Sequence, residues 1–535
     1  MQSQDDPSFS PPSRTTLSPA RLPDLARLAK LGAVPLLPGL AIWVVMLVFL
    51  ALIQFTSPDL PGNDGYYHIK LAYVMRTEGL KPDFRWLPLT ILNPREFYDH
   101  HFLFHVALIP FTYGDLRLGA KWASVIFASL AFLALWSLLR RQRVPYAWLW
   151  SLGLLAISEA FIYRMSIPRA QSLSLLMLVI GLDWLLAGKH NRLLYLAFVY
   201  VWLYNAFPLL FGLAGIYVVA TWVSEGRLVL RPLFYTAAGI LLGLVINPYF
   251  PFNIIFAYQH ILPKLVEATS VNVGSEWYPY NTGQLMRNSP LALVAFMAGA
   301  LALGLSGRRM PVRTTMAFLL ACLFGLMLFQ SRRFIEYFPA FALIFAAFAW
   351  SPIILAYSRY PQNARDHESS KIQLHSYLRK HLPAIILAVF IVPGLLLTYK
   401  DARENIGGSK SYTFYREASA WLESNTPPGG RVFQTDWDDF PRLFFYNTHN
   451  TYLVGLDPTY LQLYNTDLYD EWVEITQGRL EQPSRSIEAR FGGQYVLTDL
   501  QHGAFIERAA EDPGLVEVYR DNQAIVYQVV SSVSP

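Results

Sequence analysis

Residues 63–68 read NDGYYH and directly follow the first long apolar run of the sequence, residues 35–55. This position places one carboxylate, Asp64, on a short tether at a membrane surface. An Asp-Gly pair is ordinarily a solvated turn. Here a stretch with apolar spacing follows the pair, so we expect Asp64 near the start of an interfacial helix, whose N-terminus would orient its carboxylate.

The composition indicates a membrane protein with many spans. Of its 535 residues, 53% are hydrophobic and 15% are charged, whereas soluble domains carry roughly 25% charged residues. Residues 1–34 are polar and rich in Ser, Pro and Arg, which indicates a disordered cytoplasmic tail and not a cleavable signal peptide. The net charge of +5 comes mainly from basic loops and does not indicate nucleic-acid binding.

The apolar runs predict a transmembrane domain over residues 35–399. A spanning helix needs about 20 mostly apolar residues, and by this measure we expect about 11 spans. The expected spans are residues 35–55, 118–139, 146–162, 171–187, 193–207, 208–223, 232–249, 290–306, 314–330, 334–356 and 383–399.

The positive-inside rule orients these spans with the N-terminus in the cytoplasm. Basic clusters then fall on the cytoplasmic side, at residues 140–143, 189–192, 227–231, 308–313 and 357–382. The extracytoplasmic side receives a first outer loop (56–117), a connection at 159–170, an outer flap loop (250–289), a turn at 330–333 and the tail from Lys400. Residues 102–113 are too short to span and are expected to form an interfacial helix.

The tail, residues 400–535, is predicted to be an extracytoplasmic α/β domain. Strand-like runs alternate there with helical ones, which is typical of α/β folds. The expected strands are residues 431–434, 451–455, 494–498, 515–519 and 524–530, and the expected helices are 415–423, 458–477 and 504–511. The fold class is thus a polytopic α-helical membrane protein with a C-terminal α/β domain.

The unusual polar residues gather on the expected outer face. Asp64 and Glu276, from the first outer loop and the flap loop, are candidate ligands of a divalent cation, Mg²⁺ or Mn²⁺, which prefers such oxygen ligands. Asp99 is a candidate catalytic carboxylate. His101 and His105 share one face of a helix, as a metal-ligand pair would, but aromatic and His residues are also ordinary at membrane interfaces.

Four arginines are candidates for binding a phosphate or diphosphate: Arg164, Arg169, Arg332 and Arg333. Headgroup contact is the ordinary alternative for the first two, at a membrane edge. Glu336 lies one turn from the last two and is expected to pair with one of them, which would leave the other for substrate. In the tail, Trp437 and Asp438 follow a strand, where a binding edge of an α/β domain is expected.

Together these features resemble the GT-C class of integral-membrane glycosyltransferases, and within it the catalytic subunit of oligosaccharyltransferase. The class has an acidic motif in its first outer loop, which residues 63–68 match in position. The subunit has a flap motif of the Ser/Thr-x-x-Glu type, approximated by VGSE at 273–276, and an arginine at the mouth of a later span, as at 332–333. Its Trp-Trp-Asp-Tyr-Gly acceptor motif is echoed by DWDDF at 436–440.

The sequence departs from that pattern at two places. The family's Asp-x-Asp in the second outer loop is absent, and residues 164–171 read RMSIPRAQ. Asp99 takes over that role, or the donor chemistry differs. The first Trp of the acceptor motif is Asp436, so an Asn-x-Ser/Thr acceptor is not implied.

The resemblance implies transfer of a sugar or oligosaccharide from a polyprenyl-phosphate or -diphosphate donor to a lipid, glycan or protein acceptor. Either a divalent cation neutralises the leaving phosphate, or Asp64 acts as a general base without metal. His68, His101 and His105 are expected near the acceptor or behind the catalytic groups. A transporter of lipid-linked substrate and a non-catalytic membrane scaffold remain the alternative functions. Ionisable residues are nearly absent from the middle of the spans, which disfavours a transporter.

Overall fold

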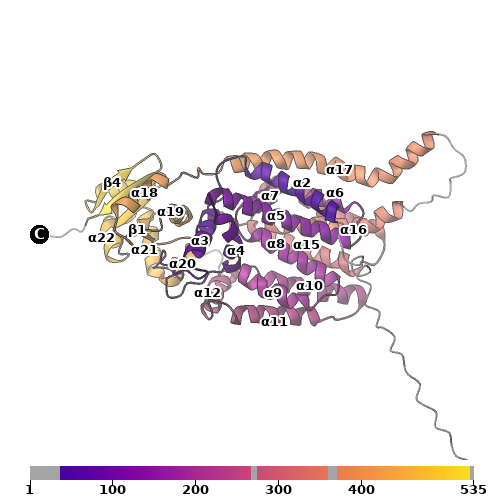
Figure 1. The fold of residues 1–535 in the computed structure, drawn as a ribbon, viewed down its shortest axis with the longest axis horizontal. Coiled ribbons are helices and arrows are strands. Elements are labelled where there is room, and N and C mark those ends of the chain that lie inside the picture. Colours follow the sequence, from indigo (N-terminus) through magenta and orange to yellow (C-terminus); the bar gives the residue numbers. More distant parts are fainter. Residues whose placement is uncertain (1–35, 267–273, 359–369, 531–535) are drawn as a thin grey trace, which may run out of the picture.

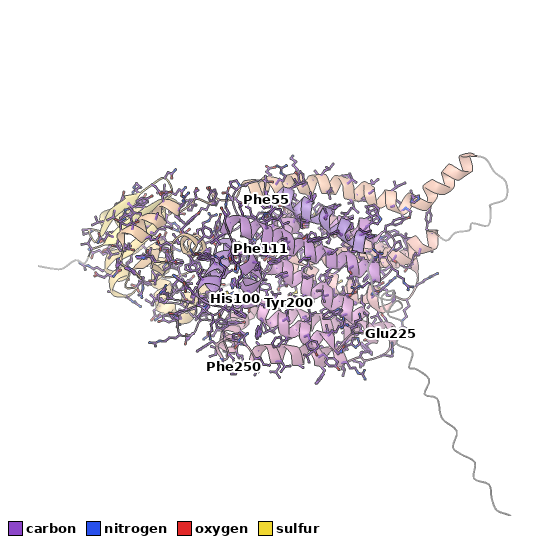
Figure 2. The ribbon with its side chains drawn as sticks, in the orientation of Figure 1. Phe55, His100, Phe111, Tyr200, Glu225 and Phe250 are labelled. Atoms are coloured by element: carbon purple, nitrogen blue, oxygen red, sulfur yellow. The ribbon has the colours of Figure 1, made fainter. Side chains whose placement is uncertain are left out.

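The computed structural model describes residues 36–266, 274–358 and 370–530. A bundle of roughly parallel helices carries a small sheet unit at one end, and helices α3 and α4 lie between the two (Figure 1). His100 lies toward the sheet unit, whereas Glu225 lies at the opposite end of the bundle (Figure 2). The sheet unit and the helices α3 and α4 therefore all lie at one end of the bundle.

Six helices in the described part of the chain are long and apolar enough to cross a membrane. They are α2 (Leu36–Gln54), α5 (Leu116–Arg141), α10 (Pro208–Glu225), α15 (Val312–Gln330), α16 (Phe338–Ser358) and α17 (Ser370–Gly407). Two bent pairs raise this number to 8 if each counts as one span. The pairs are α7 (Glu159–Ser166) with α8 (Gln171–Leu186), bent by 109°, and α13 (Thr282–Asn288) with α14 (Pro290–Ser306), bent by 87°.

The expected number of 11 spans is therefore not confirmed. Each predicted run contains a helix, but several are too short for the about 20 residues that a straight span needs. These shorter helices are α6 (Ala147–Ala156), α9 (Arg192–Leu203) and α11 (Arg231–Val245). The expected span 146–162 is interrupted because the Ser158 hydroxyl accepts the backbone N–H of Phe161 at 3.1 Å and so starts a separate helix, α7.

The first outer segment forms α3 (Asp64–Glu78), α4 (Phe102–Leu108) and the 3₁₀ turn η1 (Ile109–Thr112), so a helix is present at both places where one was expected, and their position at the membrane interface stays a prediction. The flap loop contains α12 (Phe252–Val266) and η2 (Ser275–Trp277), and η3 (Arg332–Glu336) joins α15 to α16. These short elements gather at the end of the bundle that carries the sheet unit.

Five strands form one sheet in the order β2-β1-β3-β5-β4. They are β1 (Arg431–Gln434), β2 (Thr451–Tyr452), β3 (Tyr495–Asp499), β4 (Leu515–Arg520) and β5 (Ala524–Val529), one at each predicted place. β1 runs parallel to β2 and β3, and β5 is antiparallel to β3 and β4. The helices of the unit are α18 (Arg416–Asn425), η4 (Trp437–Asp439), α19 (Phe440–Tyr446), α20 (Thr459–Tyr464), α21 (Thr466–Thr476), α22 (Pro483–Ala489) and α23 (Gly503–Glu511).

The sheet unit and the first outer segment share a core. Buried aromatic side chains of the outer segment, such as Phe84 and Trp86, pack with Phe440 and Phe444 of α19. The backbone N–H of Tyr452 on the edge strand β2 also donates to the Trp86 carbonyl at 2.8 Å. Because α17 continues to Gly407, the division of the chain at residue 400 stays a prediction. The shared core fixes the acidic turn after β1 over the start of α3.

Candidate active site

Asp64 is the first residue of α3, and a glycine allows it to reach its partner. A Cβ atom at Gly65 would lie 3.0 Å from Pro168, closer than most real Cβ contacts, so glycine favours the close approach of the helix start to the turn between α7 and α8. In this arrangement Asp64 Oδ2 lies 3.1 Å from Nε of Arg169. The carboxylate that the sequence singled out is thus ion-paired with an arginine from the second outer connection.

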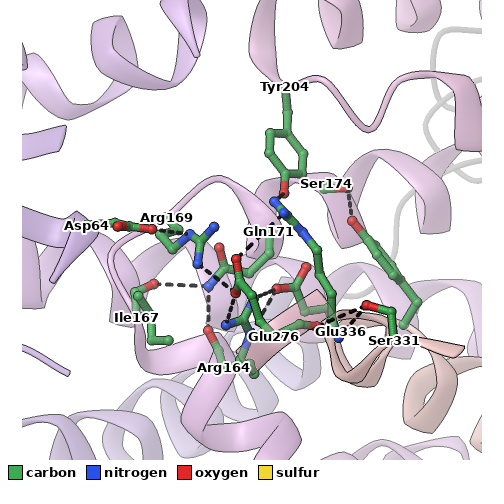
Figure 3. A network of polar contacts seen from close by, with 12 residues as sticks. Asp64, Arg164, Ile167, Arg169, Gln171, Ser174, Tyr204, Glu276, Ser331 and Glu336 are labelled. Atoms are coloured by element: carbon green, nitrogen blue, oxygen red, sulfur yellow. Dashed lines mark hydrogen bonds and ion pairs between the residues drawn. The ribbon is translucent and has the colours of Figure 1, made fainter. Parts of the chain in front are cut away.

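The turn between α7 and α8 holds two arginines in place. Pro168 prevents the first helix from continuing, and the side-chain amide of Gln171 donates to the carbonyls of Arg164 (2.6 Å) and Ile167 (3.4 Å). The sharp bend turns Arg164 and Arg169 toward the same centre (Figure 3). Arg164 and Arg169 are therefore both built into the site as cations.

Glu276 lies among three arginines (Figure 3). Its Oε2 accepts hydrogen bonds from Arg164 at 2.8 Å and from Arg169 at 3.2 Å, and its Oε1 lies 3.7 Å from Arg333. Burial alone would raise the pKa of Glu276, but the charges of the three arginines outweigh it and hold the pKa well below its usual range. The Ser331 hydroxyl also donates to the Glu276 carbonyl at 2.9 Å, which ties the flap to η3.

The two adjacent arginines of η3 point to different surroundings. Arg333 donates to the Tyr204 hydroxyl at 2.5 Å, whereas Arg332 stacks over the Tyr280 ring at 5.1 Å and donates to the Pro279 carbonyl at 3.3 Å. The expectation that Glu336 pairs with one of these two is wrong. Glu336 binds the guanidinium of Arg164, with Nε at 2.9 Å from Oε1, because η3 turns its buried side chain toward α7.

Asp99 and two histidines form a buried hydrogen-bonded chain that ends on α3 at His68. Asp99 Oδ2 lies 2.7 Å from Nδ1 of His105, and Nε2 of His105 lies 2.8 Å from Nδ1 of His68. Both ring nitrogens of His105 are therefore in use, and this arrangement does not fit the expected metal pair of His101 and His105. The His101 ring instead stacks on Tyr204, with 5.2 Å between ring centres.

The turn after β1 reaches the start of α3. The Asn63 side chain donates to Asp438 Oδ2 at 2.5 Å, and its carbonyl oxygen accepts from Nε of Arg442 at 2.8 Å. Burial, followed by the charges of Asp64 and Asp436, raises the pKa of Asp438 to about 7. Trp437 lies beside Gly274 of the flap, 3.7 Å from the place of a Cβ there. Both predicted tail residues thus border the site.

The residues around Asp64 do not fit a divalent cation shared with Glu276. The guanidinium of Arg169 bridges the two carboxylates, at 3.1 Å from Asp64 and 3.2 Å from Glu276, and so a cation already fills the position between them. Across the described residues, no three His, Cys, Asp or Glu side chains are grouped so as to hold a metal ion. This arrangement therefore disfavours a metal ion shared by Asp64 and Glu276.

Three residues of the site were not predicted. Tyr204, Asn63 and Arg442 each connect groups from distant segments. Asn63 stands beside Asp64 in the sequence, and Tyr204 begins a polar break after α9. Arg442 carries no sequence signal, since its burial arises only when the tail packs on α3 and its guanidinium lies 4.4 Å from the Tyr66 ring.

Comparisons with known proteins show which solved structures share this fold. No protein-family profile and no curated protein sequence matches the chain. In solved structures, the oligosaccharyltransferase AglB of Archaeoglobus fulgidus matches with a TM-score of 0.62 and 14% identity, over 93% of this chain and 75% of that one, both without ligand and with an inhibitory peptide and dolichol-phosphate. ArnT from Cupriavidus metallidurans, bound to undecaprenyl phosphate, matches with a TM-score of 0.55 and 14% identity over 93% of this chain and 99% of that one. The chain therefore resembles the GT-C glycosyltransferases in its fold, which confirms the resemblance inferred from its motifs.

Proposed function

We propose that this chain is an integral-membrane glycosyltransferase. It transfers a sugar or oligosaccharide from a polyprenyl-phosphate or -diphosphate donor to an acceptor on the extracytoplasmic side of the membrane. The observation that carries this proposal is the succession along the chain of a polar, arginine-lined cavity and an apolar cavity between the helices of the bundle.

The polar cavity has a volume of about 360 Å³, and its charged lining consists of Arg164, Arg332, Glu159 and Glu276. Arg164 is paired there with two carboxylates. Arg332 has no carboxylate within ion-pairing distance among the described residues, and it is the arginine left to bind an anion. Since guanidinium groups match the geometry of phosphate oxygens, this cavity suits the phosphate end of a donor.

The apolar cavity has a volume of about 370 Å³ and lies between α6, α14, α16 and α17. Ala156 and Ile157 border it, whereas Glu159 and Ala160 border the polar cavity. Only Ser158 separates these two sets along the chain, and its hydroxyl lies 2.7 Å from that of Ser289. An amphiphile with an anionic head and a long apolar chain matches this succession, as a polyprenyl phosphate does.

The chemistry follows from the charges. Arg164, Arg169 and Arg333 are paired with Asp64, Glu276 and Glu336 in this cluster, and the guanidinium of Arg332, which has no such partner among the described residues, stabilises the phosphate as the glycosidic bond breaks. Asp64 places a carboxylate beside the reacting sugar, where positive charge develops in glycosyl transfer. Trp437 and Asp438 border the acceptor side. The divalent cation expected from the sequence has no role in this proposal, because Arg169 bridges its two expected ligands.

The test uses the purified protein in nanodiscs with synthetic undecaprenyl-phosphate- and diphosphate-linked monosaccharides and octyl glucoside as a simple alcohol acceptor. We expect release of the polyprenyl carrier together with a glycosylated acceptor. Asp64→Ala should lower this turnover at least about 100-fold, whereas Asp83→Ala, at an exposed site in the same outer segment, should retain it.

Other outcomes would overturn the proposal. A transporter would move labelled donor between the leaflets of proteoliposomes without releasing carrier. A scaffold would give no product, and its partner binding would not respond to Asp64→Ala. Wild-type protein that is folded and inserted, yet turns over none of the donors, would contradict glycosyl transfer from these lipids.

A further inference from the structure

The hydrogen-bonded chain of Asp99, His105 and His68 lies directly behind the residue that opens α3. His68 is four residues after Asp64, which puts both side chains on one face of the helix. All three members are buried, with exposed fractions of 3% for Asp99, 0% for His105 and 4% for His68. In the described part of the chain, Asp99 has no lysine or arginine within ion-pairing distance. Burying a carboxylate without a cationic partner costs free energy. The hydrogen-bonded pair of imidazoles offsets part of this cost for Asp99.

The hydrogen bonds determine which nitrogen of each ring carries the proton. Asp99 accepts, so Nδ1 of His105 donates and its Nε2 must accept. Nε2 of His105 then accepts from Nδ1 of His68. This leaves Nε2 of His68 with a lone pair. The chain thus ends in a base whose positive charge, once protonated, is balanced by Asp99 through His105.

His68 is the end of this chain that lies towards Arg169, the ion-pair partner of Asp64. Its ring lies 4.9 Å from that of His101, which stacks on Tyr204, the partner of Arg333. Burial, His105 and then Arg169 lower the pKa of His68 well below 6.5, so the ring is neutral and able to accept a proton at neutral pH. The titratable or charged groups around it are Asp64 on its own helix, Tyr67, His100, His101, His105, Asp99 and Arg169.

We propose that His68 is the general base of the transfer and that His105 and Asp99 are positioning residues that set its tautomer and stabilise its charged form. This inference rests on the proposed function. The acceptor oxygen forms a bond to the anomeric carbon, the bond from that carbon to the donor phosphate breaks, and its electron pair leaves with the phosphate. The acceptor proton moves to Nε2 of His68 and later returns to water. Asp64, held by Arg169 at 3.1 Å, is left to stabilise charge on the sugar.

Asp99→Asn tests the tautomer directly. Asp99 Oδ1 accepts the backbone N–H of His101 at 3.0 Å. The amide oxygen of an asparagine would keep that bond, and its NH₂ group would face His105 and force Nδ1 to accept. His105 would then donate from Nε2, His68 would accept at Nδ1, and its Nε2 would carry a proton and no longer act as a base. ¹⁵N-histidine NMR in nanodiscs should show both rings changing tautomer.

The kinetic expectation uses the same donors and octyl glucoside. Asp99→Asn should lower kcat about 10²- to 10⁴-fold, the usual contribution of a general base, with little change in KM for the donor. In the wild type, kcat should fall at acid pH as His68 becomes protonated, and this limb should be absent in Asp99→Asn. Since the residues act as one unit, adding Asp99→Asn to His68→Gln should cost little more than His68→Gln alone.

The matched control is Asp499→Asn in the sheet unit. Asp499 Oδ1 also lies 2.6 Å from Nδ1 of a histidine, His502, and also accepts a backbone N–H, from Gln501 at 2.9 Å. This variant should keep kcat and the pH profile of the wild type. The proposal fails if Asp99→Asn, shown folded by its NMR spectrum, keeps the wild-type kcat and pH profile, or if its effect multiplies that of His68→Gln. Absence of transfer in the wild type would instead overturn the proposed function, and the tautomer measurement would still stand.

Discussion

Asp438→Asn is expected to stabilise the protein at pH 8 far more than at pH 5. In the folded protein, burial and the charges of Asp64 and Asp436 raise the pKa of Asp438 to about 7, whereas an aspartate in an unfolded chain titrates near 3.9. The folded state therefore binds the Asp438 proton more tightly than the unfolded state does. As pH rises from about 4 to about 7 the free energy of unfolding falls, and it stays lowered above pH 7. Asparagine remains neutral and escapes this loss.

The magnitude follows from the size of the shift. A difference of about three pKa units corresponds to about 4 kcal/mol at pH 8, and at pH 5 only about 1.5 kcal/mol of it has accumulated. The first figure is an upper limit, since Asp438 is only partly buried. The asparagine oxygen keeps the hydrogen bond from Asn63, which lies at 2.5 Å in the wild type, so the substitution removes charge with little loss of contact.

The assay is thermal unfolding followed by tryptophan fluorescence in detergent, between pH 5 and pH 8. The difference in Tm between Asp438→Asn and wild type should widen by several degrees across this range. Asp83→Asn, at an exposed position, should run parallel to the wild type. A difference that stays constant with pH would show that Asp438 does not carry a raised pKa, and that the approach of the tail to Asp64 is looser than described.

Three further results are expected. Arg332→Ala should raise KM for the polyprenyl donor about 10- to 100-fold, because it removes a charge-assisted contact worth about 1.5–3 kcal/mol. Arg287→Ala, at an exposed position, should leave this KM unchanged. Equal effects of the two substitutions on KM would contradict a phosphate site at Arg332. Glu276→Gln should lower the free energy of unfolding by about 1–3 kcal/mol, because it removes the charge that three arginines share; an unchanged Tm would show that they do not depend on it. Transfer should persist in excess EDTA, since Arg169 fills the place between Asp64 and Glu276; loss of activity on chelation and its return with Mg²⁺ or Mn²⁺ would refute this.

The sequence predicted the fold class well where local pattern decides it. Strand β1 has the predicted bounds, 431–434, and the other four strands begin within one residue of their predicted starts. Each apolar run also became helical. The number of spans was not predictable in the same way, since hydropathy cannot see where a helix breaks. The Ser158 hydroxyl caps the start of α7, and a single serine within an apolar run does not by itself predict such a helix break.

For the site, the sequence identified most of the side chains but not their partners. Arg164, Arg169 and Glu276 were all candidates, yet nothing in the spacing indicated that one glutamate would receive three arginines. Asp99 was expected to supply a carboxylate to the reaction centre, and it lies instead behind two histidines. The pairings of Glu276 with Arg164 and Arg169 join residues more than a hundred positions apart, and only the packing of the flap against the turn between α7 and α8 determines them.

Arg169 changes the chemical interpretation of Asp64. A free carboxylate at the start of an interfacial helix would serve equally well as a metal ligand or as a general base. With the guanidinium of Arg169 at 3.1 Å, this carboxylate already has a cationic partner, which leaves no gap for a second cation between it and Glu276. The same helix then offers His68 one turn later, with a lone pair directed by Asp99 through His105. The two duties first considered for one carboxylate are thereby divided: Asp64 and the arginines stabilise charge, and His68 takes the proton.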